Sequence, residues 1–333
     1  MNKRDVWMDI LSSFDHAQLG LKMALLSDRF DVLVDKHFDG KSELTIWRRI
    51  RIEKDEGPKP KQSIQIGDNN NFVDFPLSDR QMPNKICFKN LQIQYFDHSV
   101  ITFLHAKKRF FDRSGTKLEL DVLSDAQPIW DVLASEIWPI FVTSIHHLGI
   151  INDDDLDKFR RRTSPTILTD LDQLNSIDSG GLFPDGIADD GPNATAGQAL
   201  TKWLHTPTTN GQPKRLYRNA YLGPPNLEWV NDFKELSTFR RATTSVSYQI
   251  QLYFCADTMP TEQFELVNGR TKEKLTLKIS EEYNGSMYNW LLQRCPIGET
   301  ATAPVKWEDQ HKDSGANLNN IRFVLWSFDS SIG

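Results

Sequence analysis

The segment Leu118–Val122 reads Leu-Glu-Leu-Asp-Val, in which apolar side chains alternate with acidic ones. Side chains of a strand point alternately to its two faces, so this alternation predicts a strand with one buried face. Similar apolar runs begin at Leu91, Ile145 and Leu171, and the four starting points are 27, 27 and 26 residues apart. Segments typical of helices separate these runs. The sequence therefore predicts an α/β body of recurring strand–helix units.

The recurring pattern places this body at residues 83–255. We expect helices at 99–110, at 129–138, from residue 153 onward, at 196–205 and at 227–239, and further strands at 215–217 and 248–253. The spacing lies in the range of leucine-rich repeats, about 20 to 29 residues. Such repeats stack because a single unit cannot bury its own apolar face. The asparagine pattern of those repeats is missing, so chance periodicity in an ordinary α/β domain is the alternative interpretation.

A β-rich connector is predicted before the body, at residues 41–82. Apolar and basic residues alternate at 49–52, which favours extended chain. A Gly-Pro-Lys-Pro sequence at 57–60 interrupts that pattern, and Gly67–Asn71 predicts a loop or hairpin turn.

A β-rich cap is predicted after the body, at residues 256–333. The Asn268-Gly269 pair is a turn signal between apolar runs at 264–267 and 275–278. With further runs at 290–295 and 321–326, these segments predict an antiparallel meander. A meander in this place would cover the end of a stacked body.

The first 40 residues have a helical pattern. Apolar residues recur at helical spacing from Val6 to Phe14, and Asp15 and Ser27 are suited to begin two further helices. Three short helices in so few residues form a bundle too small to bury all of its apolar side chains. Either the rest of the chain or a partner must cover them.

This N-terminal segment resembles an F-box. The resemblance runs from Val6 through the Ile10-Leu11-Ser12-Ser13-Phe14-Asp15 sequence to Leu26-Ser27-Asp28-Arg29-Phe30 and on to Asp35. The family usually opens with Leu-Pro-x-Glu, where this chain has Asn2–Asp5. The whole layout is also similar to the expanded F-box families of nematodes. The resemblance implies that seven apolar residues contact a Skp-type adaptor: Val6, Ile10, Leu11, Phe14, Leu19, Leu25 and Phe30.

Composition limits the classes of partner and compartment. The 39 basic and 45 acidic residues give a net charge of −6, which argues against nucleic acid as a partner. The Arg160-Arg161-Arg162 run is expected to lie on a solvated face. The three cysteines lie far apart and in apolar surroundings, so we expect small buried side chains in a reducing compartment. No secretory or membrane-spanning pattern is visible, which favours cytoplasm or nucleus.

No sequence pattern predicts catalysis, a cofactor or a metal. Phosphate-binding loops and hydrolase or zinc-protease motifs are missing. The consecutive Asp97-His98-Ser99 cannot assume the geometry of a catalytic triad, and we expect Ser99 to cap the following helix. Neighbouring His146 and His147 on a strand point to opposite faces, which argues against a shared metal ion.

The leading hypothesis is a non-catalytic substrate-recognition subunit of a Skp–cullin–F-box ubiquitin ligase. Its expected partners are a Skp-type adaptor and a protein target of unknown identity. The alternative is a repeat-type interaction scaffold without a ubiquitin role, whose N-terminal helices merely cap the body.

Overall fold

The computed structural model describes residues 7, 10–11, 27, 29–30, 32–33, 36, 45–47, 49–54, 62–68, 71–75, 86–88, 90–94, 97–107, 115–122, 127–150, 153–209, 211–218, 237–255, 263–283, 287–297 and 319–325. The chain forms two compact units. Unit 1 comprises residues 1–129, 136–144 and 317–333, and unit 2 comprises residues 130–135 and 145–316. The four-part division expected from the sequence stays a prediction.

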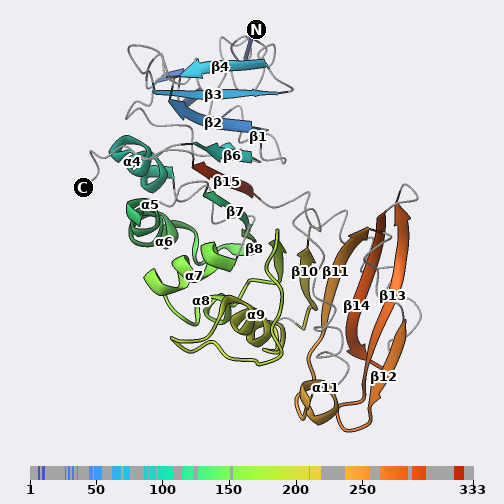
Figure 1. Cartoon of the computed structure of the whole chain (residues 1–333). Coiled ribbons are helices and arrows are strands. Elements are labelled where there is room, and N and C mark those ends of the chain that lie inside the picture. Colours follow the sequence, from blue (N-terminus) through green and yellow to red (C-terminus); the bar gives the residue numbers. More distant parts are fainter. Residues whose placement is uncertain are drawn as a thin grey trace. The chain divides into compact units, whose positions relative to one another are not determined.

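Unit 1 contains a mixed sheet with the strand order β4-β3-β2-β6-β15-β7 (Figure 1). Its strands are β2 (Arg49–Lys54), β3 (Gln62–Asp68), β4 (Asn71–Phe75), β6 (Asn90–Ile93), β7 (Thr116–Val122) and β15 (Asn319–Leu325). A separate parallel pair joins β1 (Thr45–Trp47) to β5 (Ile86–Phe88). Helices α4 (His98–Lys107) and α6 (Trp138–Phe141) lie in unit 1. Helix α5 (Gln127–Val132) and a π-helical turn, η4 (Leu133–Ile137), precede α6, and residues 130–135 of these two elements belong to unit 2.

The two faces of the unit 1 sheet differ in chemistry. Neighbouring strands align the buried side chains of Leu91, Ile321 and Leu118 in one row, and Phe141 of α6 packs against Phe323 on the same face. The opposite face carries charged side chains, and Arg322 forms an ion pair with Asp121 there at 2.9 Å. This arrangement confirms the amphipathic strand predicted from Leu118–Val122, whose exposure alternates along its length.

Unit 2 contains a seven-strand sheet with the order β12-β13-β14-β11-β10-β9-β8 (Figure 1). Its strands are β8 (Ile145–Ile150), β9 (Ser176–Ser179), β10 (Lys214–Arg218), β11 (Tyr248–Cys255), β12 (Phe264–Asn268), β13 (Glu273–Tyr283) and β14 (Met287–Pro296). Its helices are α7 (Asp153–Arg162), α8 (Ile167–Asp170), α9 (Ala196–Leu204) and α11 (Ser237–Arg241). The pairs β8–β9, β9–β10 and β10–β11 are parallel. The pairs β11–β14, β14–β13 and β13–β12 are antiparallel.

The register of unit 2 sorts its side chains into rows. One row is apolar across all seven strands and consists of Leu148, Ile177, Leu216, Ile250, Leu292, Leu277 and Phe264. The adjacent row, on the other face, is polar across all seven strands and consists of His147, Ser176, Arg215, Gln249, Gln293, Thr276 and Glu265. Tyr248 contacts His205 after α9, which places the end of this helix on the apolar face. These two neighbouring rows therefore differ in chemistry, one apolar and one polar, because successive residues of a strand point to opposite faces.

Local sequence signals explain the helix ends in unit 2. Helix α9 begins with a capping box, in which the Thr195 hydroxyl accepts the N–H of Gln198 and the Gln198 side chain accepts the N–H of Thr195. Helix α7 begins with three aspartates and ends with three arginines, an order that suits the helix dipole. Both helices were predicted at these positions.

Several expected strands are confirmed. Antiparallel pairing of β3 with β4 brings Asp68 opposite Asn71, which confirms a hairpin at the predicted turn. The β12–β13 hairpin turns after Asn268, as expected, and continues into β14 as an antiparallel meander. The consecutive parallel strands β8 to β11 agree with recurring α/β units, while the likeness to leucine-rich repeats stays a prediction.

Three sequence predictions were wrong. The segment 321–326 does not complete the antiparallel set, because β15 lies parallel between β6 and β7. The run beginning at Leu171 is not a strand at its start; Leu171 and Leu174 are buried in a turn, and β9 begins at Ser176. Apolar residues mark burial but do not distinguish a packed turn from a strand.

The third wrong prediction concerns the start of α4. Ser99 does not cap this helix, because the Asp97 carboxylate accepts the N–H of Val100 at 2.9 Å and the helix begins at His98. Aspartate is among the best N-cap residues, and it precedes Ser99 by two positions. The triad residue types are therefore explained by a helix start.

Candidate functional site

The predicted adaptor-binding residues fall in a part of the chain that is described only at single positions. Trp7, Ile10 and Leu11 are helical, as are Phe30 and Leu33. The other predicted contact residues, Val6, Phe14, Leu19 and Leu25, lie outside the described residues. The three-helix arrangement itself therefore stays a prediction.

The described N-terminal side chains divide into covered and accessible groups. The rings of Trp7 and Phe30 meet edge to face with centroids 5.4 Å apart, so the first and third predicted helices contact each other. Leu11 is fully buried, whereas the side chain of Ile10 is 41% exposed and that of Val32 is 66% exposed. The backbone N–H of Phe30 donates to the carbonyl oxygen of Ser27 at 2.9 Å and to its hydroxyl oxygen at 3.4 Å, which agrees with the expected role of Ser27 at a helix start.

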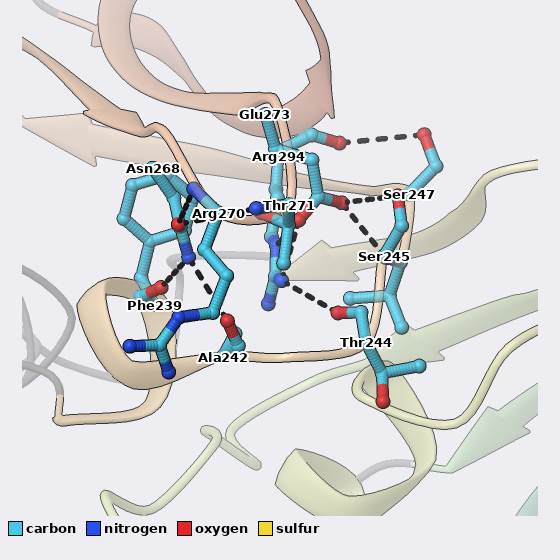
Figure 2. Close-up of polar contacts among 11 residues, drawn as sticks. Phe239, Ala242, Thr244, Ser245, Ser247, Asn268, Arg270, Thr271, Glu273 and Arg294 are labelled. Carbon is cyan, nitrogen blue, oxygen red and sulfur yellow. Dashed lines mark hydrogen bonds and ion pairs between the residues drawn. The ribbon is translucent and has the colours of Figure 1, made fainter.

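A second candidate region surrounds the buried Arg294 of β14 (Figure 2). Its guanidinium donates to the Glu273 carboxylate at 2.7 Å and to the carbonyl oxygen of Thr244 at 3.2 Å. The same carboxylate accepts the Ser245 hydroxyl at 3.0 Å and the backbone N–H of Val246 at 2.7 Å. We call these five residues the Arg294 cluster. The side chains of Arg294 and Glu273 are 1% and 0% exposed, so each charge depends on the other and on the surrounding hydrogen bonds.

Asn268 extends this polar network to α11. Its amide nitrogen donates to the carbonyl oxygen of Phe239 at 2.6 Å, and its amide oxygen accepts the N–H of Arg270 at 2.9 Å (Figure 2). The Arg294 guanidinium also lies over the Phe239 ring, 5.3 Å from its centroid. Asn268 and Arg294 thus connect α11 to the β12–β13 hairpin and to β14, and we assign this region a structural role.

Buried titratable groups lie next to the cluster on the same sheet face. Burial lowers the pKa of Lys214 to about 7 and that of His205 to about 4. The Lys214 ammonium donates to the carbonyl oxygen of Trp203 and lies 5.1 Å from the centroid of the Trp203 ring. Burial also raises the pKa of Tyr248. Shifted pKa values can mark catalytic sites, but here the first cause is desolvation in a packed core.

A third candidate is an open pocket of about 330 Å³ in unit 2. The pocket is lined by Asp157, Arg160, Arg161, Pro165, Pro192, Asn193, Ala194 and Thr195, and we call it the Arg160 pocket. The side chain of Arg160 is 4% exposed, which corrects the expectation that the whole arginine run is solvated. Four hydrogen bonds explain its burial: to the carbonyl oxygens of Pro165, Ala194 and Gly191 and to the carboxylate of Asp157.

Other sequence candidates have structural roles. His146 and His147 are consecutive on β8, and the Nδ1 atom of His147 lies 2.9 Å from the Ser176 hydroxyl oxygen. Cys295 is buried, in agreement with the packing role predicted for it, and Trp203 and Trp290 are buried as well. Among the described residues, no three His, Cys, Asp or Glu side chains gather in a way that could hold a metal ion.

Comparisons with known proteins add no assignment. Family models, curated proteins and solved structures were all compared with this chain, and none of them matches it. None of the helices in the described part of the chain has both the length and the apolar character needed to cross a bilayer. The functional argument therefore depends on the residues themselves.

Proposed function

We propose that this chain is a non-catalytic substrate-recognition adaptor of a Skp–cullin–F-box ubiquitin ligase. In this role the N-terminal helical segment binds a Skp-type adaptor, and the C-terminal body binds a protein target. Such a subunit performs no chemistry of its own. It holds the target close to an activated ubiquitin donor and so raises the effective concentration of the two reactants.

The observation that carries the proposal is the accessible apolar surface at the F-box-like N-terminus. Ile10 belongs to the set that the F-box pattern assigns to the adaptor, and 41% of its side chain is exposed. Val32, from the third predicted helix, is 66% exposed. The Trp7–Phe30 contact supports a common bundle for these helices. A protein partner that covers Ile10 and Val32 would gain hydrophobic free energy of about 25 cal/mol for each Å² of apolar surface removed from water.

The first test is capture of a purified Skp-type adaptor by the intact chain and by an Ile10→Asp variant. A charge at the centre of an apolar interface is left without a partner, so we expect adaptor binding to weaken at least tenfold. Because Ile10 is partly exposed, the melting temperature of the free variant should stay close to that of the parent. Affinity is measured by biolayer interferometry and folding by circular dichroism.

The matched control is Ile187→Asp, which changes another exposed isoleucine, 63% accessible and located in unit 2. This variant should capture the adaptor as well as the parent does. The proposal is refuted if the intact, folded chain fails to bind the adaptor at micromolar concentrations, or if Ile10→Asp and Ile187→Asp bind it equally well.

A second candidate function is an interaction scaffold without a ubiquitin role, and the complete burial of Leu11 favours it. A buried Leu11 fits an N-terminal segment that packs against the chain's own residues and needs no partner to cover it. In that case removal of residues 1–38 should unfold unit 1, and no adaptor should bind. An adaptor subunit should instead lose adaptor binding while the rest of the chain stays folded, as reported by the cooperative thermal transition.

A further inference from the structure

Strand β12 is the outermost strand of the unit 2 sheet (Figure 1). It pairs with β13 on one side, and no strand that the structure describes pairs with it on the other side. The open edge of a sheet presents backbone N–H and C=O groups that can bind a further strand. β12 contains neither a proline nor a bulge, two features that often block such an edge. This edge is therefore a candidate interaction surface.

The side chains of β12 leave apolar surface accessible on both faces of the sheet. The side chain of Val267 is 59% exposed and lies on the same face as Glu265, the single charged residue of the strand. Phe264 and Leu266 lie on the apolar face and are only partly buried, whereas the β13 residues opposite them are fully buried. The apolar face thus ends in two side chains that a further strand would cover.

The sequence of β12 is complementary to itself when two copies run antiparallel. If Leu266 lies on the twofold axis, it faces Leu266 of the second copy on the apolar face. Glu265 then faces Val267 of the second copy, and Phe264 faces Asn268 of the second copy. This register pairs every residue of the strand, continues the apolar face and places no two like charges opposite each other.

The neighbouring registers are less favourable. Centring the pairs on Glu265 would pair only residues 264–266 and would bring two carboxylates together. Centring the pairs on Val267 would pair only residues 266–268. The register centred on Leu266 is therefore the one that two copies of this strand would adopt.

We propose that two copies of this chain associate through β12, antiparallel and with twofold symmetry, so that their unit 2 sheets join into one. A twofold interface uses the same surface on both subunits, which a self-complementary strand provides. The pairs β11–β14, β14–β13 and β13–β12 are already antiparallel, so the added strand continues the local pattern. A five-residue strand gives a small contact area, and we therefore expect a reversible dimer with a dissociation constant of about 10 µM.

This inference is independent of the ubiquitin-ligase proposal. β12 belongs to unit 2, whereas the predicted adaptor contacts lie in the first 40 residues of the chain. Self-association and adaptor capture are separate measurements. Failure of one leaves the other standing.

The test is sedimentation equilibrium of the full chain, which should form dimers at concentrations up to about 200 µM. Val267→Glu places a carboxylate opposite Glu265 twice in each dimer, so dimerisation should weaken about tenfold or more. Val267→Lys places an ammonium opposite the same carboxylate twice, so this variant should dimerise at least as well as the parent. Both changes are at an exposed side chain, and melting temperatures confirm that the variants are folded.

A reversal of the charges tests the register directly. The double variant Glu265→Lys, Val267→Glu restores opposite charges across the axis and should dimerise about tenfold more tightly than Val267→Glu alone. The matched control is Ile187→Glu, which adds the same charge at an isoleucine that is 63% exposed and lies outside β12. This control should dimerise as the parent does.

Three results would overturn the proposal. A parent chain that stays monomeric at about 200 µM would leave the edge to a strand of a different protein. A dimer that Val267→Glu leaves intact would use another surface. Equal weakening by Val267→Glu and Val267→Lys would indicate an apolar contact without the register centred on Leu266.

Discussion

The Arg294 cluster and the Arg160 pocket are each built around a buried arginine, and they differ in how far the arginine's carboxylate partner is exposed to solvent. In both regions a buried arginine donates to one carboxylate and to backbone carbonyl oxygens. The carboxylate of Glu273 is fully buried, whereas that of Asp157 is 29% exposed. The described groups that accept hydrogen bonds from the Arg294 guanidinium are the buried Glu273 carboxylate and the Thr244 carbonyl oxygen, whereas the exposed Arg161 follows Arg160 directly in the sequence.

This difference separates a closed ion pair from one at the edge of an open pocket. A closed ion pair has all its partners within the protein and offers a ligand nothing that is not already satisfied. In the open pocket the Arg161 guanidinium is exposed and forms no hydrogen bond or ion pair with a described residue. A buried arginine is therefore not a sign of function in itself; the state of its neighbours decides which role it has.

The largest effect expected from this comparison comes from Glu273→Ala. The change leaves the Arg294 guanidinium buried without a counter-ion and removes the acceptor of Ser245 and Val246. Loss of one member of a buried pair costs about 3–5 kcal/mol of unfolding free energy. Urea denaturation of unit 2 should show this loss. A Glu273→Leu, Arg294→Met double variant should lose less, since it buries no unpaired charge, and an equal loss would contradict the assignment of a closed ion pair.

The next effect is expected from the neutral state of the buried Lys214, and for a change of one pH unit it is smaller. Its pKa of about 7 lies below the value of 10.5 for an exposed lysine, so between these values the unfolded chain binds a proton that the folded chain does not. The stability of the folded state should therefore rise with pH from about 7 to 10, by up to about 1.4 kcal/mol per pH unit, and level off below 7. Urea titrations at several pH values measure this slope.

The control for that slope is Lys214→Met, in which no group titrates at this position. The difference in stability between parent and variant should shift in favour of the parent as the pH rises. A pH-independent difference would show that the ammonium is solvated in the folded protein and that the core here is open to water.

The smallest effect is expected from Arg161→Ala. The side chain is exposed and forms no bond to a described residue, so the unfolding free energy should change by less than about 0.5 kcal/mol. Thermal denaturation measures it. A loss of more than about 1 kcal/mol would mean that Arg161 holds the fold, as Arg160 does, and would remove the contrast between the two positions.

The local elements were largely predictable because their signals are local. The capping box of α9 lies within four residues, and the alternation in β7 within seven. The position of β15 was not predictable in this way. Residues 319–325 read as a strand in the sequence, but nothing in them specifies that their neighbours are β6 and β7, more than 190 residues earlier. Pairing over such distances is decided by the packing of the whole sheet.

The candidate sites were harder to predict than the elements. The arginine run at 160–162 was visible, but burial of its first member depends on carbonyl groups from residues 191 and 194, which the sequence does not link to it. The Glu273–Arg294 pair is separated by 21 residues and has no motif. A useful signal was available for it, since two opposite charges occur within otherwise apolar or alternating strands. Such charges point to a buried partner.

The position of β15 in the sheet has a consequence for folding during synthesis. Residues 145–316 precede this strand, so a ribosome completes all of unit 2 before the last strand of the unit 1 sheet exists. Until then β6 and β7 each have an unfilled side where β15 will insert. An unpaired strand edge can form hydrogen bonds with a strand of another chain. The nascent chain is therefore prone to aggregate until β15 is synthesised and inserted, unless a chaperone binds it or synthesis is fast.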